Sequence, residues 1–159
     1  MRKGIRHSRF FNLVFGVILL IVSVSTTTYA QDITEEDFKE QQLVLKENPK
    51  DFGANWLHGA WYYNQAIPPH METTKMGVVE YLKEGEPYEK KKEDLLKKSL
   101  TYFENAYALA NAEQKNNLKD IFRRLYQELG VIPKAKTNQK QIDATLDAKL
   151  AEIVFKEID

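Results

Sequence analysis

The sequence predicts an all-α fold built from antiparallel helix pairs. Apolar residues recur at steps of three and four along most of the chain after residue 31. No segment shows the apolar–polar alternation of a half-buried strand. Proline or glycine stands near most ends of the apolar stretches, as expected where helices stop. The connections are short enough for antiparallel neighbours, except the one between Ile67 and Glu86.

Residues 1–30 have the pattern of a secretory signal peptide. Four basic side chains stand at the start, an apolar run follows over 10–24, and Thr28-Tyr29-Ala30 fits the small-x-small cleavage rule. The run is about 15 residues long, shorter than the ~20 that span a bilayer. We therefore expect cleavage after Ala30 and export, to the periplasm or outside the cell. Membrane contact is expected only if this segment stays uncleaved as an anchor.

Charge and cysteine content exclude several classes of function for residues 31–159. The chain has 23 basic and 23 acidic residues, but four basic ones precede Gln31, so the remainder carries a net charge of −4. A mildly acidic domain gives no electrostatic reason to expect nucleic acid as a partner. The absence of cysteine excludes disulfides, thiol nucleophiles and thiolate metal ligands.

The first predicted helix begins near Thr34 and ends at Asn48-Pro49. Thr34 can cap it, with Asp37 at the third helical position in the manner of a capping box. A proline disfavours helical backbone in the residue before it, so the helix should stop at Asn48.

The second predicted helix runs from about Phe52 to Ile67, where Pro68-Pro69 should end it. Its central glycine, Gly59, costs roughly 1 kcal/mol relative to alanine. That cost is understandable if a neighbouring helix passes close to Gly59. A short helix is predicted over 74–82, with Gly85 just past its end.

Three more helices are predicted towards the C-terminus. One opens at Glu86-Pro87 and runs to about Ala110, and the next should end at Gly130. The last runs from about Asn138 to the end of the chain. Its expected apolar face consists of Ile142, Leu146, Leu150, Ile153 and Val154. Expected core residues of the two preceding helices include Leu95, Leu96, Phe103, Tyr126 and Leu129.

Asn48 to Ala66, followed later by Ser99 to Ala110, resembles the tetratricopeptide repeat, a 34-residue helix-turn-helix unit, here of an extracytoplasmic bacterial type. Pro49 stands ten residues before Gly59, which is the family's spacing from one unit's closing proline to the next unit's glycine. The positions that match the family's packing residues are Gly59, Tyr62, Ser99, Phe103, Ala106, Tyr126 and Gly130.

The resemblance implies a right-handed solenoid over residues 31–159. It would hold about two and a half units, an insertion at about 68–86 and a C-terminal capping helix. The sequence departs from the family's pattern in several places. Asn55 replaces a tryptophan, His58 stands where leucine is usual, and Asn111 replaces the closing proline.

The resemblance also implies a concave groove lined by the first helix of each unit. Trp56 and Tyr63 would lie there in the first full unit, and Arg124 and Gln127 in the second. An extended peptide could place apolar side chains on the rings and its carboxylate or backbone near Arg124. Alternatively, the preceding helix and the insertion cover Trp56 and Tyr63 as part of the core.

The search for catalytic residues finds no arrangement typical of an enzyme. His58 has no carboxylate three or four residues away, and His70 follows two prolines in a predicted loop. Nucleophile and phosphate-binding motifs are absent from the sequence. We therefore expect neither catalysis, nor a metal site, nor a cofactor.

Together these observations predict a non-catalytic scaffold that binds a protein or peptide partner in the cell envelope. One alternative is an accessory protein whose aromatic residues stack on a sugar or another small molecule. Another is a structural subunit that dimerises through residues 68–85. The sequence leaves the oligomeric state open.

Overall fold

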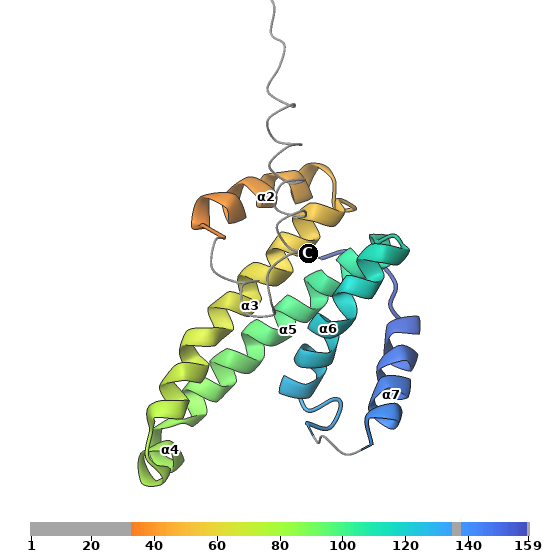
Figure 1. Ribbon diagram of the computed structural model, residues 1–159. Coiled ribbons are helices and arrows are strands. Elements are labelled where there is room, and N and C mark those ends of the chain that lie inside the picture. Colours follow the sequence, from red (N-terminus) through yellow and green to blue (C-terminus); the bar gives the residue numbers. More distant parts are fainter. Residues whose placement is uncertain (1–32, 135–137, 159) are drawn as a thin grey trace, which may run out of the picture. The chain divides into compact units, whose positions relative to one another are not determined.

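The computed structural model describes residues 33–134 and 138–158 (Figure 1), so the predicted signal peptide lies outside the described residues. Residues 32–159 form one compact unit. Across the described ranges all regular structure is helical. The helices are α2 (Glu35–Glu47), α3 (Phe52–Lys75), α4 (Val78–Glu84), α5 (Glu86–Leu109), α6 (Ala112–Glu128) and α7 (Gln139–Ala151). Within these ranges, no helix is long and apolar enough to cross a membrane.

The start of α2 and its joint with α3 are fixed by short-range polar contacts. The predicted capping box is present: the Asp37 amide donates to Thr34 Oγ1 at 3.1 Å, and the Thr34 amide donates to Asp37 Oδ2 at 2.9 Å. At the joint, the buried Asn55 side chain donates to the Pro49 carbonyl at 2.9 Å and to the Asp51 carbonyl at 2.8 Å. Asn55 therefore locks the turn from within α3, in place of the tryptophan typical of the repeat.

The prediction that Pro68-Pro69 ends the second helix is wrong. Helix α3 continues through both prolines to Lys75. Each proline removes one backbone donor, but Ala66, Pro69 and Thr73 are buried along the same stretch. Helix α3 also packs along α5 as the most extensive contact between any two described helices. Burial of one face against α5 therefore carries the helix past its local stop signal.

Helix α5 passes close to Gly59 of α3, as the position of this glycine inside a helix predicts. A Cβ atom added there would lie 2.8–2.9 Å from atoms of the Phe103 ring. One turn before Phe103, the buried Ser99 hydroxyl donates to the Gly59 carbonyl at 2.8 Å. Ala106, one turn further on, is fully buried. Gly59 of α3 thus contacts both Ser99 and Phe103 of α5.

Helix α5 follows its predicted boundaries closely, whereas α4 begins at Val78 and not near residue 74 as predicted. Helix α4 is shorter than predicted and ends at Gly85, which is also the residue before α5. A Cβ atom at Gly85 would lie 2.6 Å from the Tyr81 carbonyl oxygen, so the tight turn requires glycine. In Figure 1, α3 and α5 run antiparallel, and α4 forms the tip that joins them.

Helix α6 begins at a second capping box and ends as predicted at Gly130. Gly130 has φ +70°, which glycine adopts without steric cost. The Val131 amide donates to the Tyr126 carbonyl at 2.7 Å and the Gly130 amide to the Gln127 carbonyl at 3.2 Å. This pair of bonds is a Schellman motif, which satisfies the last carbonyls of the helix.

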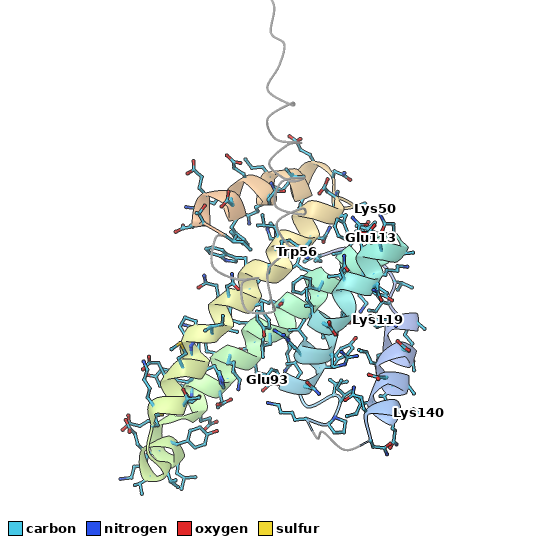
Figure 2. The ribbon with its side chains drawn as sticks, in the orientation of Figure 1. Lys50, Trp56, Glu93, Glu113, Lys119 and Lys140 are labelled. Carbon is cyan, nitrogen blue, oxygen red and sulfur yellow. The ribbon has the colours of Figure 1, made fainter. Side chains whose placement is uncertain are left out.

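Helix α7 packs on α6 through apolar and charged contacts. Ile142, Leu146 and Leu150 are buried, and Arg123 pairs with Asp143 at 3.0 Å. Lys119 reaches from α6 to Asp147 of α7 at 2.8 Å (Figure 2). The prediction that this helix runs to the chain end is wrong, because it stops at Ala151. Val154, expected on its apolar face, is 63% exposed.

The main core lies between α3, α5, α6 and α7. Of the five residues predicted for it, Leu96, Phe103 and Tyr126 are buried, while Leu95 and Leu129 pack at its edge half-buried. Its other buried members are Ala60, Ala66, Leu118, Phe122, Leu125, Ile132, Ile142, Leu146 and Leu150.

Candidate partner-binding surface

The four predicted groove residues lie on α3 and α6. Trp56 and Tyr63 are half-buried and pack against the core, with the Trp56 ring edge-on to Phe103 at 6.5 Å (Figure 2). Arg124 is exposed on α6, and the half-buried Gln127 donates to the Pro133 carbonyl at 3.3 Å. Within the described residues, no hydrogen bond, ion pair or ring contact joins the α3 pair to the α6 pair. The groove therefore stays a prediction, and each α3 ring has both a buried and an exposed part.

The other aromatic residues of α3 pack against α2 and α5. Phe38 of α2 stacks on Trp61 at 5.0 Å and meets Tyr62 edge-on at 5.8 Å. Tyr62 also stacks on Tyr102 of α5 at 5.7 Å. Since Trp56 instead faces Phe103, the α3 rings are divided between two sides of the helix. Trp61 and Tyr62 therefore serve packing between helices.

His58 is held inside this aromatic cluster and is not arranged as a catalytic base. It is 1% exposed and lies between the Phe38 ring at 4.5 Å and the Tyr102 ring at 4.9 Å. Its Nδ1 lies 3.0 Å from the Ala54 carbonyl, which can only accept, so Nδ1 carries the proton. Burial lowers the pKa of His58 below its ordinary value, and the bond to Ala54 opposes that shift. His58 therefore acts as a buried core residue whose pKa lies below its ordinary value.

We expect His58 to make the fold less stable in mild acid. Because its pKa is lowered in the folded chain, the unfolded chain binds the extra proton first as pH falls below about 6.5. The free energy of unfolding should therefore decrease between pH 7.5 and pH 5.5. His58→Phe should reduce this decrease, as measured by urea unfolding at both pH values. Equal pH dependence of the parent and His58→Phe would contradict this role.

Neither a metal site nor an enclosed ligand cavity stands out in the described part of the chain. Among residues 33–134 and 138–158, no three His, Asp or Glu side chains are grouped closely enough to hold a metal ion. Two shallow surface hollows occur there. One runs along α5 between Pro87 and Lys98, and the other lies between Glu104, Tyr126 and Ile153.

The large apolar side chains with the highest exposed fractions lie on α4. Val78, Val79 and Leu82 are 79%, 69% and 77% exposed, and no residue of α4 is buried. Residues 67, 71, 81 and 88, all exposed and apolar or aromatic, lie at the adjoining ends of α3, α4 and α5. We call Val78, Val79 and Leu82 the tip surface.

Sequence reasoning placed the tip surface inside the predicted insertion but did not recognise it as exposed. The available signal was the run Val78-Val79-Glu80-Tyr81-Leu82, which is too short to show which side of a helix is buried. It also overlooked Asn105, which is buried and contacts the last residues of the chain. Nothing near Asn105 in the sequence indicates that contact.

Comparison of the chain with protein-family models, with curated proteins and with solved structures gave no match. The function is therefore argued from the geometry of the chain itself.

Proposed function

We propose that this chain is a non-catalytic protein-binding scaffold that contacts its partner through the tip surface. The observation that carries the proposal is the exposure of Val78, Val79 and Leu82 on a helix with no buried residue. Contiguous exposed apolar side chains cost solubility and commonly mark sites of protein contact. The repeat resemblance agrees with this function, since solenoid repeats usually serve as binding scaffolds.

The repeat arrangement and the location are part of the same proposal. Gly59 of α3 lies against Phe103 of α5, and Ser99 of α5 donates a hydrogen bond to the Gly59 carbonyl. A tetratricopeptide unit requires two helices packed this closely. We propose that α3 with α5 forms one unit and that α6 with α7 forms the next, degenerate one. Export to the cell envelope is proposed from the sequence of residues 1–30 alone.

The proposal is tested by placing a photo-crosslinking amino acid at position 82 in the full chain, in the cells that produce it. We expect a discrete covalent adduct with one other protein, identified by mass spectrometry. Val79→Ser in the same chain should weaken the adduct strongly, because it removes apolar contact area beside position 82. The matched control is the same amino acid at position 43, since Leu43 is also apolar and 62% exposed but lies on α2.

The outcomes separate this proposal from its alternatives. Adducts of the same kind and yield at positions 43 and 82, or none at 82, would contradict a partner site at the tip. An adduct of the chain with itself, lost on Val79→Ser, would instead support the dimeric structural subunit. A sugar-binding accessory protein would show ligand-dependent quenching of Trp56 or Trp61 fluorescence that tip substitutions leave unchanged.

A further inference from the structure

We propose that α5 carries a binding site for an extended peptide, and that residues 153–156 of the chain itself occupy this site as an internal ligand. The site lies near the C-terminal end of α5, while α4 precedes the N-terminal end. The two are separated by about 30 Å along the helix. This peptide site is therefore independent of the tip surface and goes beyond the function proposed above.

Asn105 supplies the recognition of peptide backbone. Its Nδ2 donates to the Lys156 carbonyl at 2.7 Å, and its Oδ1 accepts from the Lys156 amide at 2.8 Å. Both bonds go to the main chain of one residue, so they resemble one step of a β-ladder and do not depend on that residue's side chain. Asn105 is itself 1% exposed. A buried amide costs stability unless it is hydrogen-bonded, so the site needs an extended chain across it.

Side chains around Asn105 define what kind of peptide fits. Ile153 packs against the core, and Lys50 lies over the Phe155 ring at 5.5 Å from its centre. Lys156 pairs with Glu104 of α5 at 2.9 Å. The preferred peptide is therefore extended, with an apolar residue, an aromatic residue two positions later and a basic residue directly after that.

The tail formed by residues 152–158 is only partly buried, which makes it replaceable. It follows the end of α7 without forming a further helix. Val154 and Ile158 are exposed, and the tail's apolar anchors are the half-buried Ile153 and Phe155. Beside the tail lies the hollow lined by Glu104, Tyr126 and Val131. A second peptide could therefore begin to bind there before the tail leaves.

The first test uses the unaltered chain and a synthetic peptide of residues 151–158. We expect excess peptide to displace the tail and to raise the hydrogen-exchange rate of the chain's own Lys156 amide at least fivefold. The matched control is the same peptide with an N-methyl group on the residue corresponding to Lys156. That change removes the donor to Asn105 Oδ1 and should abolish the effect.

A second test weakens the internal ligand and measures affinity directly. Full chains carrying Ile153→Ser and Phe155→Ala should bind the fluorescent peptide at least tenfold more tightly than the parent, because their own tail competes less. Adding Asn105→Leu should remove that gain, while adding Leu82→Ser should leave it unchanged. Circular dichroism checks that each chain remains helical.

The proposal is overturned if the peptide binds neither the parent nor the helical tail variant. It is equally overturned if the N-methylated peptide displaces the tail as well as the parent peptide does. If a tail or Asn105 variant fails to fold, the comparison of the two peptides on the unaltered chain still decides the outcome. Failure here would leave the crosslinking result at position 82 unaffected.

Discussion

Gly59→Leu is expected to destabilise the fold by about 3 kcal/mol or more, because a leucine side chain must occupy space held by Phe103. Even its first carbon would lie 2.8–2.9 Å from the ring, closer than real contacts allow. Separation of α3 from α5 would also break the bond from Ser99 to the Gly59 carbonyl. A loss of this size is a large fraction of the 5–15 kcal/mol that typical domains have. Urea unfolding followed by circular dichroism measures it.

The matched control for Gly59→Leu lies in the same helix. A Cβ atom at Gly53 would meet only Asp51 Oδ1 at 3.4 Å, so Gly53→Ala should be neutral or slightly stabilising. Combining Gly59→Ala with Phe103→Leu should cost less than the sum of the two single changes, since they share one contact. If the Gly59→Leu chain is as stable as the parent, close packing against α5 is not the reason for a glycine at this position.

Phe122→Ala should cost about 3–5 kcal/mol, the second large effect that the structure predicts. Phe122 is completely buried in α6, with its ring edge-on to Tyr107 of α5 at 5.4 Å and tilted against Tyr126 at 5.8 Å. Alanine would leave a cavity at the centre of the α5–α6 contact and would remove both ring contacts. The midpoint and slope of urea unfolding give the change in the free energy of unfolding.

Two control variants show whether the loss in Phe122→Ala comes from the cavity. Phe122→Leu keeps most of the buried volume and should lose clearly less stability. Leu43→Ala, at an exposed position on α2, should be within about 0.5 kcal/mol of the parent. Equal losses for Phe122→Ala and Phe122→Leu would show that ring contacts, and not the cavity, determine the cost.

Both proposed binding sites depend on the α3–α5 pair. The tip surface is held out at the α4 end of this pair, and Asn105 lies towards the other end of α5 (Figure 1). Variants at Gly59 should therefore weaken both sites together, through loss of the folded pair. Variants at Leu82 or Asn105 should each affect one site, which makes the two groups distinguishable.

Features that depend on neighbours a few residues apart could be predicted from the amino-acid sequence. The Thr34–Asp37 capping box joins residues three apart, and the Gly130 turn is closed by bonds to Tyr126 and Gln127. The all-helical class follows from apolar spacing, which reports local geometry. The close packing at Gly59 could also be predicted. Glycine inside a helix costs stability, so its presence indicates a close neighbour even when that neighbour is unknown.

Features that depend on residues far away in the chain could be seen only once the helices had packed together. Helix α3 continues past Pro68-Pro69 because one face of its C-terminal part, with Ala66, Pro69 and Thr73, is buried. His58 is buried because Phe38 of α2 and Tyr102 of α5 enclose it, and this burial lowers its pKa. Asn105 contacts Lys156, 51 positions away in the chain, and the last helix ends at Ala151, before that contact. The exposure of the tip surface was likewise decided by packing, because α4 has too few residues for its sequence to show whether another helix covers it.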